Sequence, residues 1–181
     1  MRCFIAIDLP SPIKEYLSQI QLSLPKDDIK LVEKENLHLT LSFLGEIDEY
    51  HIERCKQILS EIKFRRFSAS LGDIGFFPSR DYIRVVWVSL EPAENIKSLH
   101  SEIYDKLRKE FEIDGRFESH ITLARVRFIR NKQEFVKNIS SLKLEKKEFE
   151  ADSFALKKST LTQKGPVYED VARFEMMSEI C

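Results

Sequence analysis

The sequence is poor in glycine and cysteine and carries almost no net charge. Only five of its 181 residues are glycine, and its three cysteines (Cys3, Cys55 and Cys181) show no CxxC spacing. We therefore expect neither a disulfide framework nor a cysteine-bound zinc site. The 29 basic and 30 acidic residues give a formal net charge of −1. This balance argues against a protein that coats long nucleic acids through its overall charge.

Long apolar runs are also absent. The first apolar stretch ends at Asp8. It is too short for the core of a signal peptide or for a membrane span. No linker rich in proline, glycine or serine divides the chain, and no coiled-coil heptads are present. Together with the unpaired thiols, these features predict a cytoplasmic protein without membrane contact, a monomer built as one domain over residues 1–181.

The most informative feature that is present is a His-x-Thr-Leu motif that occurs twice, at 38–41 and 120–123. In an extended strand, alternate side chains share a face. The histidine and threonine of each copy therefore point to one side, and the apolar residues point to the other. Two such strands facing each other would form a pocket with two imidazoles and two hydroxyls.

This set of groups suits phosphoryl chemistry without a metal. Histidine titrates near neutrality, so one imidazole can accept a proton while another donates one. Threonine hydroxyls can donate hydrogen bonds to phosphoryl oxygens in the transition state. No HxxxH pattern or carboxylate-rich cluster accompanies the motifs, so we expect no metal site. The other two histidines, His51 and His100, are expected to be solvated on a helix flank and packed near an apolar stripe, respectively.

The hydrophobic periodicity predicts an α+β fold in which each half runs strand, helix, His-x-Thr strand, helix, strand. Ser11 is expected to cap the first helix, with Pro12 at the first helical position. Such an order favours a pseudo-twofold arrangement that places the two motifs opposite each other. The expected strands are 2–9, 67–76 and 82–90, with two more near 147–158 and 167–176, and residues 31–44 and 117–128 contain the two His-x-Thr strands. The expected helices lie around 13–24, 52–62, 96–107 and 131–142.

The paired motifs resemble those of the two-histidine (2H) phosphoesterase superfamily. Four blocks are similar to its LigT-like branch: RCFIAIDLP (2–10), NLHLTLSFLGEI (36–47), RVVWVSL (84–90) and SHITLARV (119–126). That branch comprises the RNA 2′,3′-cyclic phosphodiesterases, once described as 2′-5′ RNA ligases. The resemblance implies a bilobal fold with two pseudo-twofold-related lobes of mostly antiparallel sheet, helices on the outside, and a central cleft that carries both motifs.

The resemblance also implies a reaction and the residues that perform it. A 2′,3′-cyclic phosphate is opened to a 2′-phosphomonoester without a metal or another cofactor. By position, His38 resembles the proton donor and His120 the proton acceptor, whereas Thr40 and Thr122 resemble the hydroxyls that hold the phosphate. The implied partner is an RNA or nucleotide with a 2′,3′-cyclic phosphate terminus, for example a tRNA fragment. Two alternatives stay open: a 2′-5′ RNA ligase acting on tRNA halves, and a nucleotide-binding module without turnover.

Two further residues match positions that the family places beside the bound nucleotide. Phe43 and Arg125 each lie five residues after a motif histidine. Strict alternation would turn both side chains toward the helices. A bulge or a strand end must therefore redirect them if they are to bind substrate.

Overall fold

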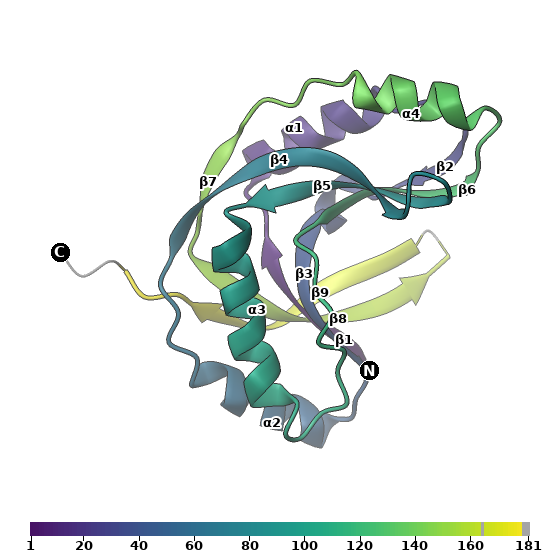
Figure 1. The fold of residues 1–181 in the computed structure, drawn as a ribbon. Helices are drawn as coiled ribbons and strands as arrows, with labels where there is room; N and C mark the ends of the chain where they lie inside the picture. Colours follow the sequence, from purple (N-terminus) through teal and green to yellow (C-terminus); the bar gives the residue numbers. More distant parts are fainter. Residues whose placement is uncertain (164, 179–181) are drawn as a thin grey trace.

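The computed structural model describes residues 1–163 and 165–178 (Figure 1). Within these residues the chain forms one sheet of nine strands and four α-helices. All pairings between the named strands are antiparallel. The helices lie in two pairs outside the curled sheet, α1 with α4 and α2 with α3 (Figure 1). The predicted α+β class is confirmed.

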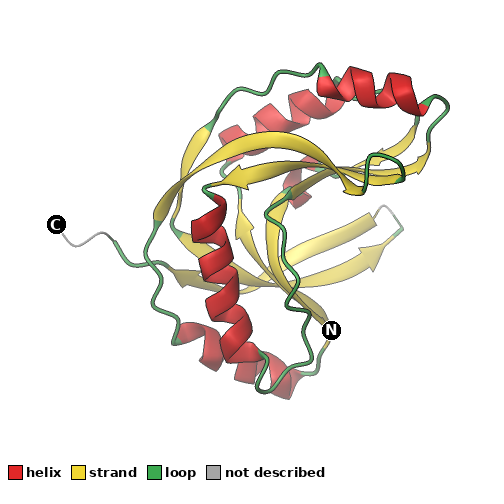
Figure 2. Cartoon of the chain, in the orientation of Figure 1, coloured by secondary structure: helices red, strands yellow, loops and turns green. Residues whose placement is uncertain are grey.

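The order strand, helix, His-x-Thr strand, helix, strand occurs in both halves of the chain. Figure 2 shows the helices lying outside the strands of the sheet. The first half contains β1 (Arg2–Asp8), α1 (Ser11–Leu22), β2 (Asp28–Leu31), β3 (His38–Glu46), α2 (Glu49–Ser60) and β4 (Phe67–Pro78). The second half contains β5 (Ile83–Glu91), α3 (Ala93–Leu107), β6 (Ile121–Phe128), α4 (Lys132–Ser140), β7 (Glu148–Ala151), β8 (Ser153–Thr162) and β9 (Gly165–Glu175).

The two motif strands meet at the centre of the sheet. The strand order is β7-β4-β5-β6-β3-β1-β8-β9, and β2 pairs with β6 beside this path. One residue pair, Leu39 with Ile121, joins β3 to β6. The sheet therefore divides there into two lobes related by a pseudo-twofold axis, with a motif strand at the inner edge of each.

Each lobe draws on both halves of the sequence. β4 from the first half pairs with β5, and β8 from the second half pairs with β1. Helix α1 packs against β6, whereas α3 packs against β3. The halves of the chain are thus interleaved, and neither forms a lobe alone.

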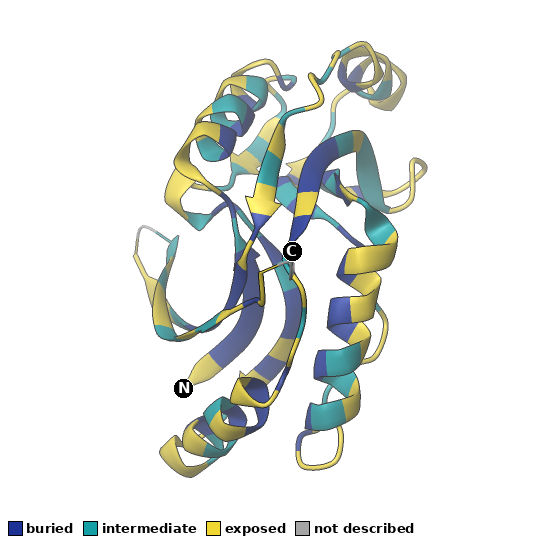
Figure 3. Ribbon diagram, turned by 90° about the vertical axis from the view of Figure 1, so that its left-hand side faces the viewer, coloured by how far each residue is buried: buried dark blue, intermediate teal, exposed yellow. Residues whose placement is uncertain are grey.

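The helices bury the apolar stripes that their spacing predicts. Ile96, Leu99, Ile103 and Leu107 of α3 are fully buried, and Ile52, Cys55 and Leu59 of α2 are buried on one face. Figure 3 shows the buried stripe on one side of the helices and the exposed residues on the other side. Each large apolar side chain removed from water contributes about 1.5–3 kcal/mol to folding. Burial of these stripes therefore holds the helices on the apolar face of the sheet.

The chain changes strand partner within two of the segments in which strands were predicted. Residues 31–44 do not form one strand: β2 ends at Leu31, a 3₁₀ turn covers Lys34–Asn36, and β3 begins at His38. Here β2 pairs with β6, and β3 pairs mainly with β1. Residues 147–158 likewise split into β7, which pairs with β4, and β8, which pairs with β1. Periodicity within a segment carries no signal for such a change of partner.

The start of α1 also differs from the prediction. Pro10 occupies the N-cap position and Ser11 is already helical, without a side-chain cap. The Pro10 carbonyl accepts hydrogen bonds from the N–H groups of Ile13 and Lys14. Pro12 still lies in the first turn, where its missing N–H costs nothing.

None of the helices in the described part of the chain is long and apolar enough to cross a membrane.

Candidate active site

The register of β3 and β6 places the four motif side chains together. Because Leu39 pairs with Ile121 in antiparallel strands, His38 lies beside Thr122, and Thr40 lies beside His120. Leu39 and Ile121 are fully buried on the apolar face. Residues at odd offsets from them point to the other face. The two histidines are therefore diagonal neighbours, about 7–8 Å apart.

A bulge in β3 redirects Phe43. Ile5 of β1 pairs with Ser42 and Ala6 pairs with Thr40, so Leu41 is an extra residue in β3. The extra residue reverses the alternation that follows it. Phe43 consequently lies on the same face as Thr40, where its side chain is 68% exposed.

The same bulge occurs in β6. Val86 of β5 pairs with Ala124 and Trp87 pairs with Thr122, so Leu123 is the extra residue. Arg125 is exposed and shares the face of Thr122. Residues 38–46 and 120–128 show an identical order of half-buried, buried and exposed positions. The bulge expected from the sequence is therefore present in both strands, at the leucine of each motif.

A buried polar side chain from a helix contacts the carbonyl of each bulged leucine. The Gln21 Nε2 of α1 donates to the Leu123 carbonyl at 2.8 Å and also to the Val32 carbonyl at 2.8 Å. The His100 Nδ1 of α3 donates to the Leu41 carbonyl at 2.7 Å. Both side chains are buried. His100 is packed, as predicted, and its ring stacks on Phe117 with centroids 4.4 Å apart.

Hydrogen bonds fix the tautomer of His38. Its Nδ1 lies 2.6 Å from the Asn36 carbonyl, which can only accept, so the proton is on Nδ1 in the neutral ring. Its Nε2 lies 2.9 Å from Thr40 Oγ1 and accepts the hydroxyl proton. Burial lowers the pKa of His38 to about 4, although the bond to Asn36 and the charge of Asp8 act to raise it. His38 is therefore neutral at pH 7 in the empty site.

His120 has the same arrangement in the other lobe. Its Nδ1 lies 2.8 Å from the Glu118 carbonyl, so its Nε2 is also the unprotonated nitrogen. Burial lowers the pKa of His120 below the usual value, against the opposing effect of Glu118. Each imidazole thus has an unprotonated Nε2, which in His38 accepts a hydrogen bond from the Thr40 hydroxyl, and each ring can accept a proton there.

Aromatic rings border both histidines. Phe4 and Tyr168 lie 5.0 and 5.3 Å from the His38 ring, and Phe77 lies 4.9 Å from the His120 ring. Trp87 stacks on Phe77 at 4.9 Å and is half-buried. The register of Trp87 with Thr122 places it at the edge of the site, a position that strand alternation alone does not predict.

A glycine makes room for this tryptophan. Gly75 of β4 pairs with Trp87, and a Cβ atom at Gly75 would lie 2.2 Å from the indole ring. No larger residue fits there without displacing the ring.

Lys157 forms a charged network beside His38. Lys157 is buried, with 8% of the residue exposed. Its Nζ lies 2.9 Å from Asp8 and also contacts Asp170. Asp8 is the cross-strand neighbour of His38. Burial alone lowers the pKa of Lys157, but the bonds to Asp170 and Asp8 raise it above its usual value. Lys157 is therefore a fixed cation near the site, which the sequence does not distinguish from a solvated lysine.

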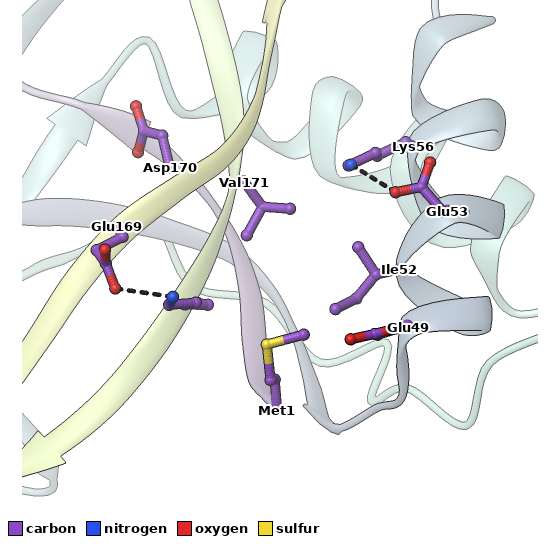
Figure 4. Close-up of a pocket in the computed structure, with 9 residues that line it drawn as sticks. Met1, Glu49, Ile52, Glu53, Lys56, Glu169, Asp170 and Val171 are labelled. Carbon is purple, nitrogen blue, oxygen red and sulfur yellow. Dashed lines mark hydrogen bonds and ion pairs between the residues drawn. The ribbon is translucent and has the colours of Figure 1, made fainter.

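Other polar features lie away from the motifs. His51 is half-buried and bonds Asp48 at the start of α2. A surface cavity of about 460 Å³ lies between α2, Met1 and the β8–β9 hairpin (Figure 4). Two ion pairs lie in its lining, Glu53 with Lys56 and Glu169 with Lys158. Among residues 1–163 and 165–178, no three His, Cys, Asp or Glu side chains are grouped to hold a metal ion.

Two His-x-Thr strands paired at the centre of a pseudo-twofold antiparallel sheet define the two-histidine phosphoesterase class. The family described as LigT like Phosphoesterase matches the chain twice, over residues 7–87 and 88–168. The chain belongs to this family. Each match contains one motif, so the repeat seen in the order of elements recurs in the family match.

Individual relatives cover nearly the whole chain. An RNA 2′,3′-cyclic phosphodiesterase of Methanocaldococcus jannaschii is 42% identical over 172 residues, which cover 93% of this chain and 97% of the relative. The crystal structure of TT0787 of Thermus thermophilus has a TM-score of 0.81 at 28% identity and covers 99% of this chain and 100% of its own. The crystal structure of Escherichia coli LigT complexed with 3′-AMP has a TM-score of 0.77 at 25% identity, with 97% of each chain covered.

The hydrogen bonds of Gln21 can be tested through stability. We expect Gln21→Met to lower the free energy of unfolding by about 1–2 kcal/mol, because two buried carbonyls lose a donor. The loss is moderate because the Val32 N–H still reaches the Leu123 carbonyl at 2.9 Å. Urea unfolding measures this change in the free energy of unfolding. Gln19→Met, an exposed position of the same helix, should change the free energy by less than about 0.5 kcal/mol. Equal losses in both variants would contradict the role given to Gln21.

Proposed function

We propose that this protein is an RNA 2′,3′-cyclic phosphodiesterase that opens a cyclic phosphate terminus to a 2′-phosphomonoester. The observation that carries the proposal is the Leu39–Ile121 pairing, which brings two imidazoles and two hydroxyls to one face of the sheet. The names of the relatives and the 3′-AMP complex of E. coli LigT support it. One chain supplies both histidines, so a monomer of one domain over residues 1–181 suffices. RNA ends such as those of tRNA fragments are the expected substrates.

The proposed mechanism uses the two imidazoles in turn. His120 takes a proton from water at its free nitrogen, and the water oxygen forms a bond to phosphorus. The bond between phosphorus and the 3′ oxygen breaks on the opposite side. His38 in its protonated form gives a proton to that oxygen. His120 ends the cycle charged and His38 neutral, and exchange with solvent restores both.

The hydroxyls and the redirected residues bind the substrate in this proposal. Thr40 and Thr122 donate hydrogen bonds to the non-bridging phosphoryl oxygens as negative charge grows on them. Phe43 offers an exposed ring on which a base can stack, a contact that contributes about 1–3 kcal/mol per base. Arg125 provides a guanidinium on the same face for an anionic group of the substrate.

Hydrolysis in a chelator tests the function directly. We expect a nucleoside 2′,3′-cyclic phosphate to be converted to the 2′-phosphate in excess EDTA, because the imidazoles carry both proton transfers. Chromatography against 2′- and 3′-phosphate standards identifies the product. Binding without turnover would favour a nucleotide-binding module. Activity that is lost in EDTA and regained with a divalent ion would overturn the metal-independent mechanism.

Loss of either imidazole should abolish most of this activity. We expect His38→Ala and His120→Ala each to lower kcat by at least ~10²-fold, the scale of general acid–base catalysis. Both side chains lie on the face of the sheet opposite the apolar core, so the variants should fold, and circular dichroism should show this. His51→Ala, which alters a histidine of α2 that bonds Asp48 and lies away from the motifs, is the control and should retain the parental kcat. A folded His38 or His120 variant with near-full activity would remove the paired-histidine mechanism.

The pKa shifts of the empty site predict a displaced pH profile. Activity needs one imidazole neutral and the other charged, so kcat/KM should be bell-shaped with pH. Burial lowers both pKa values in the free protein, so the alkaline limb of kcat/KM should lie below pH ~6.5. A bound phosphate anion favours imidazolium and raises both pKa values. The limbs of kcat should therefore lie at higher pH than those of kcat/KM. Superimposed or oppositely displaced profiles would contradict this electrostatic account.

A further inference from the structure

Two cations stand directly opposite each other on the site face of the sheet. Lys30 of β2 pairs in register with Arg125 of β6, and residues paired in this way share a face. Both are exposed. The hydrogen bonds and ion pairs of the described residues include no partner for the side chain of either one.

This pair runs against the usual arrangement of charges. Like charges directly opposite in antiparallel strands are destabilising. Elsewhere on the sheet, lysines are matched with acids, as Lys157 is with Asp8 and Lys158 is with Glu169. Sites that break a local rule of stability are typical of function. The Lys30–Arg125 pair therefore has the character of an anion site.

Its position relates it to the motif histidines. The bulge at Leu123 turns Arg125 to the face of Thr122. Arg125 follows Thr122 by three residues, so the two lie about 7–10 Å apart along the strand. Lys30 extends the positive charge across β2, and its Nζ lies close to Gly165 of the β8–β9 hairpin, 3.6 Å from where a Cβ there would stand. The pair thus lies farther along β6 than the two motifs, next to the place where they would hold the terminal phosphate.

We propose that Lys30 and Arg125 form a subsite for the backbone phosphate on the 5′ side of the cyclic terminus. The inference rests on the proposed function and deepens it: an oligoribonucleotide end is expected to be a better substrate than a nucleoside 2′,3′-cyclic phosphate. A nucleoside 2′,3′-cyclic phosphate has no phosphate at that position, whereas any longer RNA has one. The subsite therefore favours the longer substrate.

The test compares two substrates that share one terminal nucleoside, a nucleoside 2′,3′-cyclic phosphate and a dinucleotide ending in the same group. We expect Lys30→Gln to lower the ratio of their kcat/KM values, dinucleotide over nucleoside, by about 2- to 5-fold, the loss of one solvent-exposed charge contact. The slope of log(kcat/KM) against log[salt] for the dinucleotide should also fall by about 0.7. Lys30→Arg should keep the parental ratio.

Lys97→Gln is the matched control. Lys97 is exposed on α3, a helix that covers the apolar face of the sheet, so the same loss of charge should leave the ratio unchanged. Thermal unfolding should show no loss of stability in Lys30→Gln, since the substitution relieves a like-charge contact.

The outcomes separate the subsite from the proposed function. An unchanged ratio in Lys30→Gln, with the nucleoside substrate still hydrolysed, would overturn the subsite and leave the function intact. If the parental protein hydrolyses neither substrate, the proposed function fails. The ratio of the two Kd values, measured by calorimetry, then decides the subsite: a fall in Lys30→Gln supports it, and an unchanged ratio overturns it.

Discussion

The arrangement of this site depends on one extra residue in each of two strands. Without the bulges at Leu41 and Leu123, regular alternation would point Phe43 and Arg125 into the apolar layer beneath the helices. The bulge is placed immediately after the threonine of each motif. The same insertion therefore preserves the register of the histidines and turns the residues that follow toward the substrate face. A buried donor on a helix, Gln21 or His100, contacts the carbonyl of each inserted leucine.

Burial sets the protonation of the two histidines as well as their position. The aromatic rings around His38 and His120 exclude water and disfavour the charged imidazole. Near His38, the cation of Lys157 offsets part of the attraction that Asp8 exerts on a proton. The two imidazoles of a site prepared in this way carry little positive charge until an anion enters it. The substrate phosphate thus supplies the charge that lets one imidazole hold its proton, and this couples binding to the protonation state that the reaction needs.

The sequence predicted the parts of the fold that local patterns encode. Alternation within the motifs placed their histidines and threonines on one face, and the parity of Phe43 and Arg125 required a bulge. The helices followed from their apolar spacing. Alternation does not reveal which face of a strand is the core, so the position of Trp87 beside His120 was missed. It also does not reveal pairing partners, so the breaks within 31–44 and 147–158 were missed. The burial of Lys157 and Gln21 depends on contacts between distant segments and has no local signal.

The donors at the two bulges have a consequence for how the chain is assembled. Gln21 belongs to the first half of the sequence and contacts a strand of the second, and His100 does the reverse. This reciprocal exchange is the pattern of an isologous interface between identical subunits. A single-copy precursor of about half this length would satisfy both bulges only as a symmetric homodimer. In the present chain, the same exchange links the two halves into one cooperative unit, because unfolding either half removes a buried donor from the other.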